Sequence, residues 1–303
     1  MNISRGTLYA GIEGGGTKFV CAVGRSPVDV LDSTVIPTTD PQTTLAECVR
    51  FFRAAENRHG RIVSIGFSCF GPVELRAGSA GFGRMMGTPK PGWSGADLLA
   101  PLRAAFDVSV RLDVDVAGAA LAEWRLGAGR GLGSLAYVTV GTGIGGAMVP
   151  QGSGGRLMHA EMGHVRVTRH ADDHEFSGCC PFHGDCLEGL ASGPAIRARW
   201  GCDLAALPAD HVGRAIIASY LGQLAASIAL MLGVERIVFG GGVMSDGTLL
   251  PRVQESMFKL LNGYIPPLAD REAAKAYVCG PSLGANAGIA GGLLLAQEAV
   301  AGA

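Results

Sequence analysis

Three short apolar runs in this chain end in glycine clusters, and this repeated junction restricts the fold more than any other feature. The clusters lie at 14–18, in "GIEGGGTKF", at 141–146 and at 240–242. Because glycine has no Cβ, the backbone N–H groups of such turns can point at a phosphate, and the hydroxyls of Thr17 and Thr142 add donors. One such turn is a weak motif. Three together predict a protein that binds a nucleotide through several phosphate contacts.

The pattern of apolar runs around these clusters predicts an α/β fold. The first two clusters each join two runs of strand composition, which is typical of a hairpin. Further strands are expected at 61–73, 108–116 and 235–244, and a helix at 117–129. No cluster matches the pattern G-x-x-x-x-G-K-[ST], and none opens a helix as G-x-G-x-x-G, so P-loop and Rossmann folds are disfavoured. The two similar hairpins predict two similar lobes.

The second half of the chain is expected to be mostly helical after a polar segment. Residues 156–190 are rich in histidine and cysteine, whereas 211–233, 248–264 and 285–301 have the apolar periodicity of helices. The apolar stretch 221–234 contains a glutamine and a serine and is too short for a confident membrane span.

Charge and cysteine content exclude several classes of protein. The chain has 303 residues, 25 basic and 26 acidic side chains and a net charge of −1, which predicts no nucleic-acid or membrane partner. We see no signal-peptide pattern and expect a cytoplasmic protein. The eight cysteines are then expected to be reduced, which favours metal binding over disulfide bonds.

Several segments together resemble a known family of kinases. "EGGGTK", "VGTGIGGA" and "VFGGGVM" resemble the two phosphate elements and the adenosine element of sugar kinases in the actin-like ATPase superfamily. "HAEMGH" and "CCPFHGDCLEGLASGP" narrow the resemblance to the ROK family (repressors, open reading frames, kinases), and "GFSCFGPV" and "TPKPGW" to its bacterial fructokinase branch. The resemblance runs from residue 11 to about residue 292.

This resemblance implies a fold, a lobe division and a nucleotide site. The fold is the α/β actin-like ATPase (ribonuclease H-like) fold, with two lobes that each contain a mixed sheet flanked by helices. One lobe spans 1–116 and is completed by a C-terminal helix at about 288–303; the other spans 117–287 and contains a zinc-binding segment at 156–190. The residues implied to bind ATP and Mg²⁺ are Glu13, Gly15, Gly16, Thr17, Lys18, Thr142, Gly143, Gly241 and Gly242. Glu13 stands where most relatives have aspartate.

A carboxylate is needed to accept the proton of the sugar hydroxyl during phosphoryl transfer. Asp113 and Asp115 both stand at the end of an expected strand. The family pattern has an aspartate eight residues before a glutamate, and counting back from Glu123 selects Asp115 as the catalytic base. The alternative is that Asp115 only caps the following helix. Ala117 stands where the family has asparagine.

The resemblance places Glu161, His164 and Glu188 in the sugar site. It implies ATP-dependent phosphorylation of a hexose at its terminal hydroxyl, with fructose as the expected substrate and fructose 6-phosphate as the product. Mannose, glucose, allose and N-acetylmannosamine are the alternative substrates, and a non-catalytic sugar sensor is a weaker alternative. A homodimer is expected because dimers are common in the family.

Two imidazoles and two thiols predict a metal site in the polar segment. Cys180, His183 and Cys186 form a C-x₂-H-x₂-C run, and His164 lies sixteen residues upstream of the first cysteine. Four nitrogen and sulfur ligands without a carboxylate are typical of a structural, tetrahedral Zn²⁺ site. Cys179 is the alternative ligand, since the C-x-C-x₄-C spacing that is more frequent in the family, measured back from Cys186, would select it.

Overall fold

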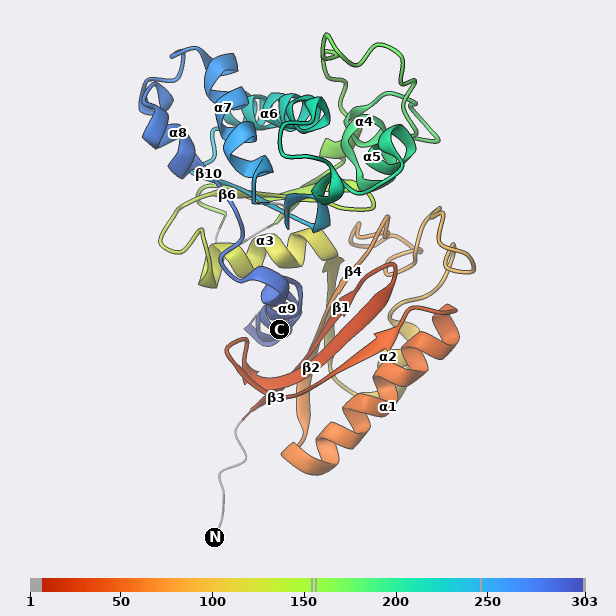
Figure 1. The fold of residues 1–303 in the computed structure, drawn as a ribbon. Helices are drawn as coiled ribbons and strands as arrows, with labels where there is room; N and C mark the ends of the chain where they lie inside the picture. The colour runs from red at the N-terminus through yellow and green to blue at the C-terminus, as the bar shows by residue number, and fades with distance from the viewer. Residues whose placement is uncertain (1–6, 154, 156, 246, 302–303) are drawn as a thin grey trace. The chain divides into compact units, whose positions relative to one another are not determined.

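The computed structural model describes residues 7–153, 155, 157–245 and 247–301. The chain divides into two compact units (Figure 1). The first unit contains residues 1–122 and 285–303, and the second contains residues 123–284. The chain therefore enters the second unit between Ala122 and Glu123 and leaves it after Gly284.

The first unit is built on a mixed five-stranded sheet with the order β3-β2-β1-β4-β5. Strand β2 pairs antiparallel with both β1 and β3, whereas β4 and β5 run parallel to β1. The strands are β1 Leu8–Gly14, β2 Lys18–Ser26, β3 Asp29–Pro37, β4 Ile62–Cys69 and β5 Ser109–Val114, and the helices are α1 Pro41–His59, α2 Ala100–Ala105, α3 Asp115–Leu126, which continues into the second unit, and α9 Ala287–Ala301.

The second unit repeats this design with the strand order β8-β7-β6-β9-β10. Strands β6 and β7 form the hairpin, β8 continues the antiparallel part, and β9 and β10 run parallel to β6. The strands are β6 Leu135–Val140, β7 Ile144–Val149, β8 Met158–Ala160, β9 Ile237–Gly240 and β10 Val278–Cys279, and the helices are α4 Leu187–Ala191, α5 Gly193–Trp200, α6 Val212–Leu232, α7 Leu249–Leu261 and α8 Arg271–Tyr277. Short 3₁₀ helices are η1 Met162–His164, η2 Leu204–Ala206, η3 Gly242–Ser245, η4 Pro266–Leu268 and η5 Gly284–Asn286.

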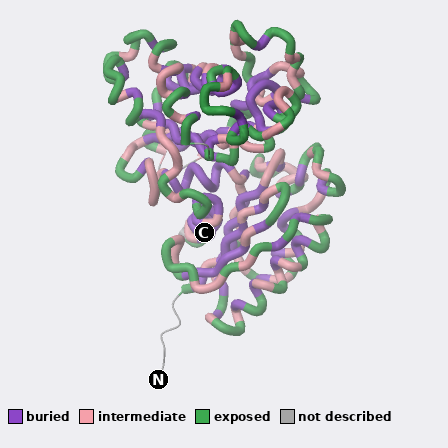
Figure 2. Tube along the Cα trace, viewed as in Figure 1, coloured by how far each residue is buried: buried purple, intermediate pink, exposed green. Residues whose placement is uncertain are grey.

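The predicted fold class, with two mixed sheets flanked by helices, is confirmed. Figure 2 shows the buried stretches along the strands of each sheet. Most expected elements are present with boundaries shifted by one to four residues, whereas β3, α1 and the short helices had no prediction. The short helices are set by tertiary packing, since a helix of one or two turns is marginal by itself.

Helix α9 packs on β1 and β4 because glycines leave room for its backbone. Gly11 and Gly66 are paired neighbours on these two strands. A Cβ on Gly66 would lie 1.9 Å from the carbonyl oxygen of Gly292, and a Cβ on Gly11 would lie 2.9 Å from the nitrogen of Leu293. The Ser64 hydroxyl also donates a hydrogen bond of 2.6 Å to Ala296 O. The last helix of the chain therefore closes the core of the first unit.

Helix α6 is the core helix of the second unit. Its most apolar stretch has a mean hydropathy of 1.8, and among the described helices it alone is long and apolar enough to cross a membrane. However, 61% of that stretch is buried inside the protein. Ile217, Tyr220 and Leu221 are fully buried in the hydrophobic core of this unit. A buried core helix has the same length and composition as a membrane span, and the packing assigns α6 to the core.

A buried carboxylate joins the two segments at which the chain enters and leaves the second unit. Glu123, the first residue of this unit, is fully buried. Its carboxylate accepts backbone hydrogen bonds from Ala128 at 2.7 Å, Ser282 at 3.1 Å and Leu283 at 2.8 Å. Three backbone N–H groups therefore depend on one buried carboxylate.

Replacement of Glu123 by alanine is expected to lower the free energy of unfolding by up to about 3 kcal/mol, because three partly buried donors lose their acceptor and a donor left unpaired costs about 1–3 kcal/mol when fully buried. Urea unfolding of the purified protein measures this loss. Glu235→Ala is the matched control, since Glu235 is exposed and accepts only one backbone hydrogen bond, from Gly133 at 2.9 Å. Equal losses in the two variants would contradict the role of Glu123.

Candidate functional site

The first glycine turn joins β1 to β2 and presents its backbone at the carboxyl end of β1. Gly15 N–H donates to Lys18 O at 2.9 Å and closes the turn. The hydroxyl of Thr38 donates to Gly15 O at 2.7 Å, and Thr38 N–H donates to Thr17 O at 3.0 Å. A Cβ on Gly16 would meet nothing within 4 Å. Gly16, Thr17 and Lys18 are exposed, so their donors are accessible to an anion.

Two carboxylates lie at the same edge of the sheet as this turn. The carboxyl ends of β1, β4 and β5 are aligned, because Gly14 pairs with Cys69 and Cys69 pairs with Val114. Glu13 precedes the turn on β1, and Asp115 follows β5 as the first residue of α3. Two strand spacings separate β1 from β5, about 10 Å. The structure thus brings the predicted base and the predicted magnesium-facing carboxylate to one edge.

The electrostatics of Glu13 reflect this arrangement. Burial raises the pKa of Glu13, the negative charge of Asp115 raises it further, and Lys18 lowers it. Gly288 of α9 makes room for the side chain, since a Cβ there would lie 2.1 Å from the Glu13 carboxyl carbon. A half-buried carboxylate repelled by a second carboxylate is stabilised by a cation, and a divalent ion placed beside both groups suits this edge.

The environment of Asp115 differs from that of Asp113. Asp115 accepts a hydrogen bond of 2.8 Å from the N–H of Val116, in the first turn of α3. A carboxylate at a helix N-terminus is stabilised in its charged form, which suits a group that must accept a proton only as the sugar hydroxyl reacts. Asp113 lies within β5 and accepts from Val114 N–H at 2.8 Å. Ala117, two residues after Asp115, is fully buried.

The second and third glycine turns lie side by side in the second unit. Strands β6 and β9 are parallel with Thr139 paired to Gly240, so their carboxyl ends coincide. Gly241 has a φ of 92°, and a Cβ there would lie 2.4 Å from Val140 O. Only glycine fits this approach. The predicted phosphate and adenosine elements of this unit are therefore neighbours.

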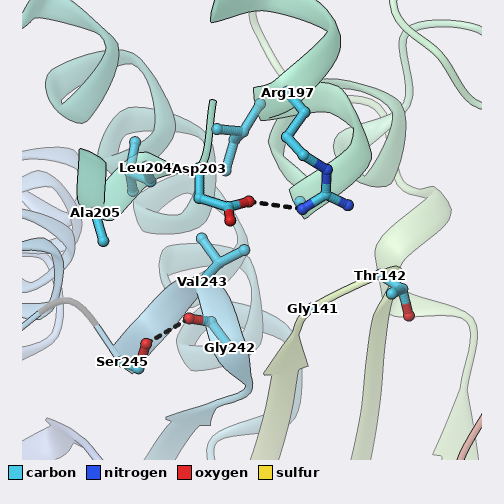
Figure 3. Close-up of a pocket in the computed structure, with 11 residues that line it drawn as sticks. Gly141, Thr142, Arg197, Asp203, Leu204, Ala205, Gly242, Val243 and Ser245 are labelled. Atoms are coloured by element: carbon cyan, nitrogen blue, oxygen red, sulfur yellow. Dashed lines mark hydrogen bonds and ion pairs between the residues drawn. The ribbon is translucent and has the colours of Figure 1, made fainter. Parts of the chain in front are cut away.

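A pocket with a volume of about 340 Å³ opens between these turns and α5 (Figure 3). The lining residues are Gly141, Thr142, Gly193, Ile196, Arg197, Asp203, Leu204, Ala205, Gly242, Val243 and Ser245. Arg197 is the one cation among them, and its Nη1 donates to the Asp203 carboxylate at 2.6 Å. Figure 3 shows this ion pair on one wall of the pocket, with Val243 and Gly242 on another. Apolar walls with a few polar groups suit a nucleoside.

Glu188 supports the turn between β6 and β7. Its Oε2 accepts a hydrogen bond of 2.9 Å from the N–H of Ile144. A Cβ on Gly143 would lie 2.7 Å from the same oxygen, so the glycine at this position admits the carboxylate. Glu188 is half-buried near the start of α4. Its carboxylate therefore connects the predicted sugar site to the predicted phosphate turn.

Glu161 directly precedes the short helix η1 and His164 is its last residue; this helix packs on the same strand. His164 N–H donates to Glu161 O at 3.1 Å, and a Cβ on Gly163 would lie 1.9 Å from Ile144 O. Ile144 is thus contacted from two sides: Glu188 accepts a hydrogen bond from its nitrogen, and η1 lies against its carbonyl oxygen. Glu161 is exposed and His164 is half-buried. The structure brings the three predicted sugar-binding residues to one region of the second unit.

The four predicted metal ligands converge. The ligand atoms of His164, Cys180, His183 and Cys186 all lie within 4.8 Å of one another. His164 Nδ1 is 3.8 Å from Cys180 Sγ and 3.5 Å from Cys186 Sγ, and His183 Nδ1 is 3.7 Å from Cys180 Sγ. In a tetrahedral zinc shell with bonds of about 2.0–2.3 Å, neighbouring ligand atoms are about 3.3–3.8 Å apart. The chemistry and the spacing of this donor set fit Zn²⁺.

Cys179, the alternative ligand, lies outside this group of four. Cys179 is exposed, whereas Cys180 is buried. The backbone explains the difference: Cys179 N–H donates to Gly189 O at 3.0 Å, and Cys180 N–H donates to Gly184 O at 3.1 Å, within a tight turn. Successive side chains point to opposite sides of this turn, and the side chain of Cys180 faces the histidines.

The pocket includes two residues that the sequence patterns did not single out. Arg197 and Asp203 stand six residues apart, on α5 and in the loop before η2, and neither belongs to a glycine cluster. Their only sequence signal is that they follow the "LASGP" segment. Gly193 in that segment donates its N–H to Gly141 O at 2.8 Å, which brings α5 to the phosphate turn.

Comparison with known proteins agrees with these observations. A sequence profile of the ROK family matches residues 9–299. The chain is 43% identical to the fructokinase of Zymomonas mobilis over 296 residues, which cover 96% of this chain and 97% of that protein. It is 37% identical to the fructokinase of Pediococcus pentosaceus, covering 97% of this chain and 99% of that one.

A solved structure extends the similarity to the fold. The ROK hexokinase from Thermus thermophilus superposes with a TM-score of 0.79 at 26% sequence identity, covering 98% of this chain and all of that one (100%). The match of the family profile over nearly the whole length, with two relatives above one-third identity, leads to one conclusion: the chain belongs to the ROK family.

Proposed function

We propose that this protein is a fructokinase that transfers the γ-phosphoryl group of ATP to the terminal hydroxyl of fructose and forms fructose 6-phosphate. The observation that carries the proposal is the 43% identity, over nearly the full length of both chains, to a protein named fructokinase. The glycine turns, the pocket beside them and the carboxylates at the sheet edge supply what phosphoryl transfer requires: phosphate contacts, a cation site and a proton acceptor.

The proposal assigns roles to both units. Gly15, Gly16, Thr17 and Lys18 in the first unit and Thr142 and Gly143 in the second contact the phosphates, and Gly241 and Gly242 border the nucleoside. Glu13 faces Mg²⁺, directly or through water. Mg²⁺ neutralises charge on the phosphates when bound.

Asp115 accepts the proton of the attacking hydroxyl, and Glu161, His164 and Glu188 hold the sugar. Carboxylates and imidazoles can bond several hydroxyl groups at once, which suits an acceptor with many hydroxyls. The hydrogen bond from Ile144 N–H fixes one oxygen of Glu188.

Zinc is proposed as a structural ion held by His164, Cys180, His183 and Cys186. The support is the convergence of two imidazoles and two thiols, without a carboxylate, with all ligand atoms within 4.8 Å of one another. His164 belongs both to this group and to the sugar segment, so the metal shapes the acceptor site without taking part in the chemistry. A homodimer and a cytoplasmic location are further proposals, supported by the family resemblance.

A substrate panel tests the proposed function. ADP release is measured with Mg-ATP and zinc-loaded protein across fructose, mannose, glucose, allose and N-acetylmannosamine. We expect a clear preference for fructose in kcat/KM. A preference for another sugar on the panel would keep the kinase reaction and correct the substrate. Turnover of no sugar would contradict the proposal and favour a sugar sensor.

Replacement of Arg197 by methionine is expected to raise the KM for ATP about five- to tenfold. The reason is that this guanidinium is the one cation lining the pocket beside the phosphate turn, and loss of one charge-assisted contact costs about 1–1.4 kcal/mol. The KM for fructose should change less than about twofold. Arg252→Met is the control, because Arg252 is exposed on α7 and bonds only Ala209 O, at 3.1 Å. An unchanged KM for ATP would remove Arg197 from the nucleotide site.

A further inference from the structure

A long segment without helix or strand carries most of the metal ligands. Residues 165–186, called here the metal segment, join η1 to α4 and include Cys180, His183 and Cys186. The segment forms turns and one isolated bridge but no longer ladder of backbone hydrogen bonds. Only isolated backbone hydrogen bonds occur in this segment, so side chains must supply much of the pairing that secondary structure provides elsewhere.

Helix α6 holds the first part of the metal segment. The side-chain amide of Gln223 accepts from Thr168 N–H at 2.7 Å and donates to Thr168 O at 2.9 Å. Tyr220, one turn earlier on the same face of α6, accepts from His170 N–H at 3.2 Å through its hydroxyl. These contacts dock residues 168–170 on the core without any metal.

Asp173 is the centre of a buried polar group in this segment. The Tyr220 hydroxyl donates to Asp173 Oδ2 at 2.6 Å, and Arg199 Nη2 donates to the same oxygen at 3.1 Å. Arg199 Nε lies 3.1 Å from Asp173 Oδ1. The two charged side chains are only 7% and 3% exposed, so their attraction is little screened by water. Arg169 adds a hydrogen bond of 2.7 Å to the carbonyl of Asp173.

Arg199 also contacts both elements that flank the metal ligands. Its Nη1 donates to Leu190 O, in α4, at 3.0 Å, and its guanidinium lies 4.1 Å from the ring centroid of Phe176. Phe176 stands four residues before Cys180, and α4 begins directly after Cys186 and contains Glu188. The guanidinium of Arg199, on α5, thus contacts both the residues that lead to Cys180 and helix α4, which follows Cys186.

We propose that Arg199 and Asp173 form a clamp that positions the metal segment and α4 before metal binding, and through α4 positions Glu188 for the sugar. Ordering a long loop costs conformational entropy. If metal binding must itself order the loop, this cost lowers the apparent affinity for the metal. With the clamp in place, the metal meets ligands that are already close together. Arg199 and Asp173 are positioning residues, since neither is within the predicted ligand set.

The clamp is tested by metal affinity and by substrate kinetics. Zinc affinity is measured by competition with a chromophoric chelator, and KM is measured separately for fructose and ATP. Arg199→Met and Asp173→Asn are expected to weaken zinc binding about tenfold or more and to raise the KM for fructose about fivefold. The KM for ATP should change less than about twofold, because the nucleotide pocket does not include these residues.

Two further variants keep the test decisive. Arg166→Met is the matched control, because Arg166 makes an exposed ion pair with Asp185 in the same segment and should leave both quantities unchanged. Tyr220→Phe removes the hydroxyl that donates to Asp173 and accepts from His170 N–H, and it leaves the Arg199–Asp173 ion pair in place. It is expected to weaken zinc binding about threefold, and it decides the test if Arg199→Met does not fold.

The outcomes distinguish failure of the clamp from failure of the proposed function. The part of the clamp proposal that concerns Glu188 and the sugar rests on the proposed function. Unchanged zinc affinity in the clamp variants overturns the clamp, even if the protein is less stable to heat. Weaker zinc binding with an unchanged KM for fructose overturns the role of α4 in placing Glu188. If the unmodified protein phosphorylates no sugar, the proposed function fails, whereas the zinc comparison still supports or overturns the clamp.

Discussion

Asp115→Asn is expected to lower kcat by about 10²–10⁴-fold, the usual contribution of a general base. The amide keeps the size of the side chain and its place at the first residue of α3, but it cannot accept the proton of the sugar hydroxyl. The KM for fructose should change little. The substitution also removes the negative charge that raises the pKa of Glu13, so the pKa of Glu13 should fall toward its ordinary value. Steady-state kinetics and carboxylate NMR measure the two effects.

Asp113→Asn is the matched control for this prediction. Asp113 lies two residues earlier, also half-buried, and bonds the N–H of the following residue as Asp115 does. Its replacement should change kcat less than about threefold. If instead Asp115→Asn keeps most of its turnover and Asp113→Asn loses it, the base is Asp113. If both retain activity, neither carboxylate is the base.

Removal of the proposed zinc is expected to lower both stability and activity. The metal segment has no helix or strand, and four ligands from distant positions would lose their common partner. Because metal binding to such a site is coupled to folding, chelation should lower the midpoint of thermal unfolding by several degrees or more. Activity should fall in parallel, since His164 is itself one of the proposed ligands and Glu188 stands two residues after Cys186. Metal content, calorimetry and ADP release follow the loss, and added Zn²⁺ should restore all three.

Single substitutions identify the ligands. Cys186→Ser should reproduce the effect of chelation without a chelator, because Cys186 is fully buried within the group of four. Cys179→Ser is the control: Cys179 is exposed and outside that group, so the variant should keep its metal and its stability. Full activity and unchanged thermal stability in metal-stripped protein would contradict a structural role for zinc.

Local patterns predicted the glycine turns and the fold class correctly, because each depends on neighbouring residues. A glycine cluster after an apolar run marks a strand end at which the backbone must turn without a Cβ, as at Gly15 and Gly241. Two hairpins of this kind were enough to predict two similar sheets, and the strand orders of the two units are the same. The roles of Asp115, Glu13 and the sugar-binding residues are still predictions.

The choice between the two neighbouring cysteines shows where the sequence reaches its limit. Spacing allowed Cys179 or Cys180 as a ligand, and the side chain of Cys180 is the one that lies with the histidines. The direction of a side chain in a tight turn depends on hydrogen bonds to Gly184 and Gly189, which belong to the folded loop. No pattern of residue types contains that information.

By itself, the sequence determined the three glycine turns, the α/β fold and the histidines and cysteines from which a metal site could form, since these follow from residue type and short spacing. Only the tertiary structure placed Arg197 against Asp203 beside the pocket, closed Glu123 onto Ser282 and Leu283, and buried Asp173 against Arg199. These pairs join segments that lie far apart in the sequence or in loops, and the packing of the helices and loops around them decides how closely they approach. The identity of a charged residue does not show whether its side chain is solvated by water or paired with a buried partner. Only the folded structure decides this.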